Sequence, residues 1–219
     1  MKNLLITGAT GNLGQAILAE FETDNDYHIN ITTRDKTDSS GRIKSFNVDL
    51  LNDASAAALV AELVETQEHI DAVIFLTGAY ISGDITKTTS ADLQKMTGVN
   101  VATAHNIAAP FMQINREQKR PLKLIFIGAK AAMNAASSIE NVAYALSKKM
   151  LFNYAELVNE SENKYGTLAH IILPGALNTR FNREAMPDAD FSKWTKPEDI
   201  SLCIKKILTT DDVEKVISL

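Results

Sequence analysis

The sequence predicts an α/β fold in which one parallel sheet of about seven strands is covered by helices on both faces. Short runs rich in Ile, Val, Leu and Phe recur along the 219 residues, and helical patterns separate them. Runs that are apolar throughout are typical of strands buried on both sides of a sheet. Because crossovers between parallel strands are right-handed, this alternation gives a doubly wound sheet, and we expect residues 1–219 to form a single domain.

The amino-terminal half supplies the first strands and helices of this pattern. The first helix carries Leu13, Ile17, Leu18 and Phe21 on one face, a spacing typical of an amphipathic helix. The alanine-rich stretch 53–66 predicts a second helix. Strands are predicted at residues 2–7, 27–33, 42–50 and 71–79.

The carboxyl-terminal half continues the alternation. Helices are predicted at about 91–113, at 144–163 and from Pro197 onward, and strands at 122–129, 168–176 and 213–219. The one long piece without a periodic pattern is Ala176–Lys196. Irregular segments of this length in compact domains are usually functional, so we expect a substrate lid at about 176–196.

Composition excludes several other classes of protein. The formal net charge of −5 gives no basic surface of the kind that binds nucleic acid. The single cysteine, Cys203, excludes an internal disulfide and suits a reducing compartment. No apolar run approaches the ~20 residues that span a bilayer, and the start MKNLLITGATG lacks a cleavage site. We therefore expect a cytoplasmic protein that binds neither nucleic acid nor membrane, and we expect no metal site.

The segment TGATGNLG places Gly8, Gly11 and Gly14 between the first strand and the first helix. A pyrophosphate can bind at a helix N-terminus only where no Cβ blocks the tight turn or the approach of the ligand. A glycine triplet alone also occurs in ordinary strand-to-helix turns. Because a strand precedes this one and an amphipathic helix follows it, we predict a Rossmann-like dinucleotide site. The other residues of the turn expected to contact the dinucleotide are Thr10, Asn12 and Leu13.

The end of the second strand bears on the choice of cofactor. It reads Thr32, Thr33, Arg34, Asp35. An acidic residue here binds the ribose hydroxyls of NAD(H), whereas an arginine accommodates the 2′-phosphate of NADP(H). Neutral residues followed by Arg34 favour NADP(H). NAD(H) is possible if Asp35 points inward, and Arg34 could also be a solvated charge paired with Asp35.

The third predicted strand ends at Asp49 and Leu50. Asp49 is well placed there for the adenine amino group of the dinucleotide, with Leu50 beside it. The alternative is that Asp49 caps the helix that follows.

Three motifs carry a resemblance to a known family. They are the glycine turn, Tyr144-x-x-x-Lys148, and PGALNT at Pro174–Thr179. A tyrosine and a lysine four residues apart are weak evidence alone, because such pairs share a face on any helix. Together and in this order, the motifs resemble those of the short-chain dehydrogenase/reductase family over essentially the whole chain. The resemblance implies an NAD(P)-dependent oxidoreductase with a small-molecule substrate.

The resemblance also implies roles for individual residues. Tyr144 would donate a proton to the substrate while hydride arrives from the nicotinamide, and Lys148 would tune Tyr144 and hold the nicotinamide ribose. Asn100 matches the asparagine that kinks its helix and supports the proton relay; the alternative is a local hydrogen bond within the helix. Further contacts with the cofactor are implied for Gly78, Ala79, Pro174, Gly175, Leu177 and Thr179.

The chemistry expected of Tyr144 depends on its pKa. A free tyrosine has a pKa of ~10, which is too high for ready proton exchange at neutral pH. We expect the ammonium of Lys148, one helical turn away, to lower that pKa together with the positive nicotinamide ring of the oxidised cofactor.

The chain departs from the family pattern in two places. FLTG (Phe75–Gly78) replaces the asparagines that often follow the fourth strand. The family's serine, which hydrogen-bonds the substrate oxygen, aligns with one of three alanines: Ala129, Ala131 or Ala132. Ser137 and Ser138 could substitute, but residues of this kind are more typical of turns and caps. Loss of one such donor reduces a rate roughly 10²–10³-fold, so the substrate must be easily reduced, another donor must act, or catalysis is absent.

The catalytic segment and the lid favour an easily reduced substrate. GAKAA at 128–132 and REAMPDADFSKW at 183–194 resemble the dihydropteridine reductases, which have alanines here and a quinonoid substrate that needs little polarisation. Those enzymes differ at the second strand, where they carry an acid and prefer NADH. The lid side chains could stack on a flat substrate, or pack the lid against its own protein or another subunit. They are Phe181, Met186, Phe191 and Trp194.

The helix that contains Tyr144 has two apolar stripes. One consists of Leu146, Met150, Leu157 and Val158, and the other of Ala143, Leu151, Phe152 and Ala155. One stripe would cover the sheet, and the second indicates a further buried surface. In the family this surface commonly meets the same helix of another subunit, so we expect a homodimer or a homotetramer.

We therefore predict an NADP(H)-dependent short-chain reductase that acts on a small conjugated carbonyl or imine-like substrate without the usual serine. The closest alternative is an NADH-dependent dihydropteridine-type reductase. An alternative of another class is a non-catalytic dinucleotide-binding sensor, because a cofactor site could persist after the serine was lost.

Overall fold

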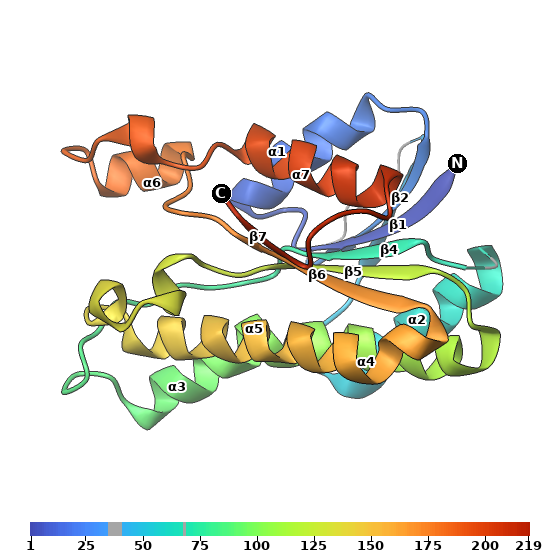
Figure 1. The fold of residues 1–219 in the computed structure, drawn as a ribbon, viewed down its shortest axis with the longest axis horizontal. Coiled ribbons are helices and arrows are strands. Elements are labelled where there is room, and N and C mark those ends of the chain that lie inside the picture. The colour runs from blue at the N-terminus through green and yellow to red at the C-terminus, as the bar shows by residue number, and fades with distance from the viewer. Residues whose placement is uncertain (35–40, 68) are drawn as a thin grey trace.

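The computed structural model describes residues 1–34, 41–67 and 69–219, and these contain one seven-stranded sheet (Figure 1). Neighbouring strands run parallel in the order β3-β2-β1-β4-β5-β6-β7. The predicted doubly wound parallel sheet is thereby confirmed. The strands are β1 (Lys2–Thr7), β2 (Tyr27–Thr33), β3 (Ile43–Asn47), β4 (Ala72–Phe75), β5 (Leu122–Ile127), β6 (Thr167–Leu173) and β7 (Val216–Ser218).

Helices cover both faces of the sheet. In Figure 1, α1 and α7 lie on one face, and α2, α4 and α5 lie on the other. Among the described residues, no helix is long and apolar enough to cross a membrane. The α-helices are α1 (Asn12–Glu22), α2 (Asp53–Gln67), α3 (Ser90–Thr97), α4 (Thr103–Gln118), α5 (Val142–Glu162), α6 (Arg180–Ala185) and α7 (Pro197–Thr209).

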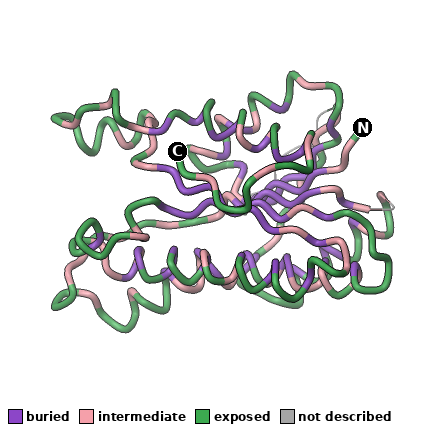
Figure 2. The backbone as a smooth tube through the Cα atoms, viewed as in Figure 1, coloured by how far each residue is buried: buried purple, intermediate pink, exposed green. Residues whose placement is uncertain are grey.

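Alternating strand residues form two separate apolar clusters, one on each side of the sheet. Leu4 and Ile6 of β1 pack with Ile17 of α1, whereas Leu5 packs with Leu59 of α2 on the other side. Figure 2 shows buried residues concentrated along the strands and on the helix surfaces that face them. Burial on both faces explains why the strands are apolar throughout.

The order of the strands reverses between β1 and β4. From β1 the chain proceeds outward to β2 and β3, and it then returns to β4 on the other side of β1. The two strands pair up to their carboxyl ends, where Thr7 lies opposite Phe75. In open α/β sheets, ligands bind outside the carboxyl ends of strands at such a switch point. The predicted site residues follow these strand ends.

The predicted helix at about 91–113 is divided by a single π-helical turn. This turn, Gly98–Ala102, joins α3 to α4 and contains Asn100. Such turns are rare and often occur at functional sites. The helical periodicity of the sequence cannot distinguish them from a continuous α-helix, because only one extra residue is inserted.

One residue of the predicted α5 stripes was assigned to the wrong stripe. Val158 is buried and continues the row of Ala143, Leu151 and Ala155 against the sheet. In a helix of 3.6 residues per turn, a row on one face advances by four residues at most steps and by three at others. The step from Ala155 to Val158 is one of three residues. The remaining members of the other stripe are exposed, and they are Leu146, Met150 and Leu157.

Replacing Gly14 with alanine should lower the stability of the fold. A Cβ at Gly14 would lie 2.2 Å from the carbonyl oxygen of Gly8, so the backbone of the turn would have to move. We expect the free energy of unfolding to fall by about 1–3 kcal/mol, the range for overpacked sites. Urea denaturation followed by circular dichroism measures the change.

Gly98→Ala is the matched control for this substitution. Gly98 is also helical, and its nearest neighbour would be the flexible end of Leu51 at 3.5 Å. Alanine favours helix by up to about 1 kcal/mol over glycine, so the control should be neutral or stabilising. Equal losses of stability in both variants would contradict the steric explanation of the turn.

Candidate active site

The turn between β1 and α1 has the shape that a pyrophosphate requires. Gly8 has a φ of 68°, and a Cβ there would lie 2.6 Å from the backbone nitrogen of Thr77. Gly11 is the N-cap of α1, and no side chain caps the first turn of that helix. Thr10, Gly11 and Asn12 are exposed. Free N–H groups and the positive end of the helix dipole together make a site for anions. The turn therefore fits the dinucleotide predicted for it.

The end of β2 presents the predicted cofactor-selecting arginine to solvent. Thr32 and Thr33 are buried and Arg34 is exposed. Asp35, the residue on which the NAD(H) alternative depends, lies outside the described residues. Arg34 is placed at the carboxyl edge of the sheet, on the side of the glycine turn.

The end of β3 places Asp49 and Leu50 at the same edge. The Asp49 carboxylate accepts the N–H of Leu51 at 2.9 Å. It does not cap the next helix, so that alternative is wrong; Asn52 does, because its side chain accepts the N–H of Ser55 at 2.9 Å. Leu50 is buried, and its carbonyl accepts the amide of Asn106 at 2.9 Å.

Asn100 joins the loop after β4 to α5. Its side chain is 1% exposed. Its Oδ1 accepts the Ala79 N–H at 2.8 Å, and its Nδ2 donates to the Ala79 carbonyl at 3.1 Å and to Ser147 Oγ at 2.8 Å. Ser147 Oγ in turn donates to the carbonyl of Tyr144 at 2.7 Å. These bonds reach two other elements, so the alternative of a purely local bond within the helix is wrong.

Gly78 lies against two other predicted site residues, Asn100 and Lys148, because it has no side chain. A Cβ on Gly78 would lie 3.0 Å from Asn100 Oδ1 and 3.6 Å from Lys148 Nζ. Lys148 of α5 and Asn100 of the π turn are therefore adjacent to the loop that follows β4.

Lys148 is buried beside the end of β5. It is 7% exposed, its Nζ donates to the carbonyl of Ile127 at 2.8 Å, and it lies 5.9 Å from the centroid of the Tyr144 ring. Burial lowers the pKa of Lys148 to about 8, because an ammonium loses hydration inside the protein. At pH 7, Lys148 therefore still carries its charge in most copies of the protein.

The protein alone does not lower the pKa of Tyr144. The expected lowering also involves the positive nicotinamide ring of the oxidised cofactor, and it stays a prediction. Burial and, to a smaller extent, the nearby Tyr80 together raise the pKa to about 12. The Lys148 ammonium is engaged with Ile127 and does not offset this burial. At neutral pH, Tyr144 consequently holds its proton, and it can give that proton up readily only where a positive charge lowers its pKa.

The alanines expected at the family's serine position lie in the loop after β5, together with Ser137 and Ser138. Ala129 is buried at the end of β5, and Ala131 and Ala132 begin a short 3₁₀ turn. Ser138 is buried and donates its hydroxyl to the Ala131 carbonyl at 2.8 Å. Ser137 is exposed in the next 3₁₀ turn, Ala135–Ser138. Both serines have the turn role that was expected of them.

The segment at about 176–196 is more regular than the sequence suggests. It contains α6 and a 3₁₀ turn, Phe191–Lys193, and is not irregular throughout. Thr195 closes its base: its Oγ1 accepts the Gly175 N–H at 2.9 Å, and its backbone pairs with Ala176 and Asn178 at 2.8 Å. Short helices with few apolar residues leave no periodic signal in a sequence.

The base of this segment holds the predicted nicotinamide contacts. The Thr179 side chain accepts the N–H of Asn182 at 3.3 Å and begins α6. The carbonyl of Leu177 accepts the Asn182 side chain at 2.9 Å. Pro174 and Gly175 directly follow β6, so this group also lies at the carboxyl edge of the sheet.

Two of the four predicted lid side chains pack against each other. Phe191 and Trp194 pack with centroids 4.9 Å apart, and the guanidinium of Arg183 lies 5.4 Å from the Phe191 centroid. Phe181 and Met186 are exposed. The contact between Phe191 and Trp194 lies within the segment itself, so it distinguishes neither stacking on a substrate nor packing against the rest of the protein or another subunit.

Sequence reasoning missed two residues of the site. Ser147 lies between the motif residues Tyr144 and Lys148, but only the fold shows that it bonds Asn100. The ring of Tyr80 contacts that of Tyr144 edge-on, with centroids 5.0 Å apart. Its one sequence signal is its place two residues after Gly78.

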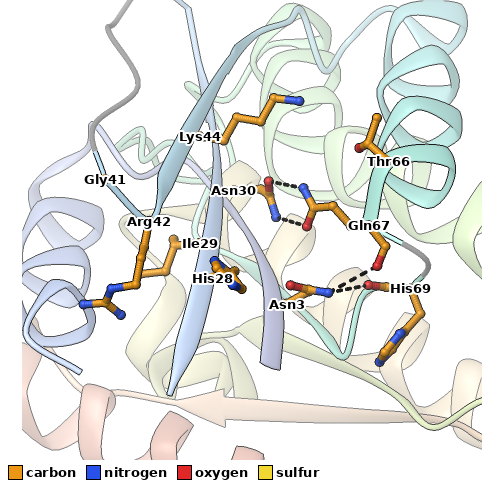
Figure 3. A pocket seen from close by; sticks show the side chains of 10 residues that line it. All are labelled: Asn3, His28, Ile29, Asn30, Gly41, Arg42, Lys44, Thr66, Gln67 and His69. Atoms are coloured by element: carbon orange, nitrogen blue, oxygen red, sulfur yellow. Dashed lines mark hydrogen bonds between the residues drawn. The ribbon is translucent and has the colours of Figure 1, made fainter. Parts of the chain in front are cut away.

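A cavity of about 510 Å³ lies elsewhere, near the amino ends of β1 and β2. Asn30 and Gln67 exchange two hydrogen bonds across it, and Asn3 donates to the carbonyls of Gln67 and His69 (Figure 3). Its amides thus bind one another, and it is at the opposite end of the strands from the glycine turn.

Comparison with known proteins agrees with this geometry. The family model described as short chain dehydrogenase matches residues 2–190. A dihydropteridine reductase from Dictyostelium discoideum is 23% identical over 205 residues, which are 91% of this chain and 84% of that protein. A 3-ketodihydrosphingosine reductase from Bacteroides thetaiotaomicron is 23% identical over 179 residues, 81% of this chain but only 65% of that protein.

Solved structures share the fold along almost the whole chain. ElxO with NADP bound matches with a TM-score of 0.87 at 18% identity, covering 99% of this chain and 96% of that one. An oxidoreductase of the short chain dehydrogenase/reductase family from Burkholderia thailandensis matches with a TM-score of 0.83 at 19% identity, covering 99% and 90%. At these identities the likeness concerns the fold.

Replacing Lys148 with methionine should stabilise the protein at neutral pH. The folded pKa of about 8 lies below the ordinary 10.5, so the unfolded chain binds more protons between these values and stability rises with pH across that window. Below pH 8 the full penalty of the buried charge is present. Lys148→Met removes it, and we expect the free energy of unfolding at pH 7 to rise by about 1–3 kcal/mol, less the loss of the bond to Ile127.

Denaturation at pH 7 and at pH 10 measures this effect. The gain should shrink at the higher pH, where the parent lysine is already neutral in the folded state. Lys149→Met is the control, because Lys149 is exposed and its removal should leave stability nearly unchanged. A Lys148→Met variant that is less stable than the parent at pH 7 would contradict the cost assigned to the buried ammonium.

Proposed function

The chain belongs to the short-chain dehydrogenase family of NAD(P)-dependent oxidoreductases, and on that premise we propose that it is an NADPH-dependent reductase of a small conjugated carbonyl or imine-like substrate. The observation that carries the proposal is the geometry of Tyr144: Lys148 Nζ lies 5.9 Å from its ring centroid, and Ser147 and Asn100 hold its backbone. A proton held at the Tyr144 hydroxyl suits reduction, in which the substrate oxygen or nitrogen must gain one.

Each residue of the site has a part in this proposal. When bound, a nicotinamide dinucleotide supplies the hydride. Tyr144 Oη gives its proton to the substrate heteroatom. The Lys148 ammonium stabilises the phenolate that forms and binds the nicotinamide ribose. Asn100 holds Ala79 and, through Ser147, the backbone of Tyr144 in place.

The cofactor is proposed to bind along the carboxyl edge of the sheet. The glycine turn takes the pyrophosphate, Asp49 and Leu50 contact the adenine, and the residues after β6 contact the nicotinamide. Exposed Arg34 after two neutral threonines favours a 2′-phosphate and hence NADPH. One structural relative is described with NADP bound, which agrees with this preference.

The substrate class is inferred from what the site lacks. The positions that align with the family's serine are alanines, and Ser138 is tied to the Ala131 carbonyl. Because Tyr144 already donates a proton, an electrophilic conjugated substrate needs little further polarisation. The segment at 176–196 is proposed as the lid over it.

A second candidate is an NADH-dependent dihydropteridine-type reductase. It is favoured by the similarity to the dihydropteridine reductase of Dictyostelium discoideum and by the same alanines. It requires Asp35, rather than Arg34, to face the adenosine ribose.

The quaternary structure is proposed to be a homodimer or a homotetramer. The exposed side chains of Leu146, Met150 and Leu157 form a row along α5 that the fold itself leaves uncovered. Burial of this row against the same helix of a second copy would remove it from water.

Titration with NADPH and NADH tests the cofactor. We expect NADPH to bind at least about tenfold more tightly, because a charge-assisted contact to the 2′-phosphate contributes about 1.5–3 kcal/mol. Arg34→Ala should lose most of that difference and leave NADH binding unchanged. Arg120→Ala, an exposed arginine before β5, is the control. Tighter binding of NADH by the parent would favour the dihydropteridine-type alternative.

Turnover tests the acid. Oxidation of NADPH with a panel of quinones, pterins and diketones should identify a substrate, and Tyr144→Phe should reduce its kcat about 10²–10⁴-fold. Tyr154→Phe is the matched control, because Tyr154 lies on the same helix and its pKa is likewise raised to about 12 by burial.

Two results would contradict the proposed reductase. Equal rates for the parent and Tyr144→Phe would exclude the acid role of Tyr144. Tight binding of NADPH with no oxidation across the panel would favour the dinucleotide-binding sensor.

A further inference from the structure

Tyr80 is an exposed aromatic residue held beside the reacting group. Its residue is 62% exposed, and the only other aromatic residue so exposed in the described ranges is Phe181. A single exposed ring is ordinary on a protein surface, so the position of Tyr80 beside Tyr144 is what carries meaning. Since it directly follows Ala79, its position depends on the bonds between Ala79 and Asn100.

The backbone on the other side of Tyr80 is also fixed. Gly83 donates to the Glu140 carbonyl at 2.8 Å, and its own carbonyl accepts the N–H of Val142 at 3.0 Å. The segment from Ala79 to Gly83 is therefore attached at both ends, once to the π turn and once to the start of α5. A ring carried on such a segment is positioned before any ligand arrives.

The two tyrosine rings form a corner at the catalytic phenol. Their centroids are 5.0 Å apart and their planes are inclined at 63°, an edge-to-face arrangement. In such a pair the face of one ring remains available for a further contact. The effect of Tyr80 on the pKa of Tyr144 agrees with this proximity.

The lid offers fewer free aromatic faces than the sequence suggests. Phe191 lies between Trp194 and the guanidinium of Arg183, and these contacts use its surface. Tyr80 has no such neighbours beyond Tyr144 among the described residues, and its hydroxyl makes no hydrogen bond with them. The ring itself is therefore its available feature.

We propose that Tyr80 binds the substrate by stacking on its conjugated plane and that it selects flat, ring-fused dicarbonyl or cyclic imine substrates over non-planar ones. This inference rests on the proposed reductase function and names the substrate class more narrowly. Tyr80 positions the ring system, while Tyr144 remains the acid. The hydroxyl of Tyr80 has no part in it.

Equilibrium binding tests the proposal with 9,10-phenanthrenequinone as the planar probe and camphorquinone, a bicyclic diketone without a flat ring system, as the control. Isothermal titration is performed on the full chain saturated with NADP⁺, so that the quinone is not reduced. Tyr80→Leu should weaken binding of phenanthrenequinone about 5- to 10-fold and change camphorquinone less than about twofold. Tyr80→Phe keeps the ring and should bind both probes like the parent.

The outcomes separate this inference from the function on which it rests. Loss of binding in Tyr80→Phe would overturn it by assigning the role to the hydroxyl. Equal losses for both probes in Tyr80→Leu, or no binding of phenanthrenequinone to the parent, would also overturn it. A further outcome is that Tyr80→Leu selectively loses binding of the planar probe, while the parent binds NADPH but does not oxidise it with any quinone. This result would support the stacking role and overturn the reductase.

Discussion

The site depends on the buried amide of Asn100. This one side chain bonds both backbone groups of Ala79 and the hydroxyl of Ser147, so it connects the loop after β4, the π turn and α5. Each partner left unsatisfied in the interior would cost about 1–3 kcal/mol. The bonds therefore form together, and the positions of Gly78, Tyr80 and Tyr144 are consequences of one network.

Burial sets the chemical state of the two catalytic candidates before any ligand is considered. Desolvation opposes the charged form of each group, so it raises the pKa of Tyr144 and lowers that of Lys148. The protein thus presents a neutral phenol and a lysine near its titration point. In the proposed function, Lys148 and the bound cofactor together would supply the positive charge that favours the phenolate.

The sequence predicts the parts of this molecule that depend on local sterics or on long apolar runs. The glycine turn is one, because no other residue fits at Gly8 and Gly14; the seven strands are another. It does not predict features that depend on tertiary neighbours. The short helix α6 and the contact of Tyr80 with Tyr144 belong to this class, whereas the irregular turn at Asn100 was implied by the family resemblance alone. The raised pKa of Tyr144 belongs to the same class as α6, because its chief cause is burial, which a sequence does not display.

The closure at Thr195 has a consequence for how such a protein can change over time. Bonds from Thr195 to Gly175, Ala176 and Asn178 fix both ends of the segment at one point, directly after β6. Insertions, deletions and substitutions between these ends need not disturb the strand or the residues that follow it. In the proposed function this segment is the substrate lid, and its closure at one point would let it be exchanged as a unit during evolution without changing the glycine turn.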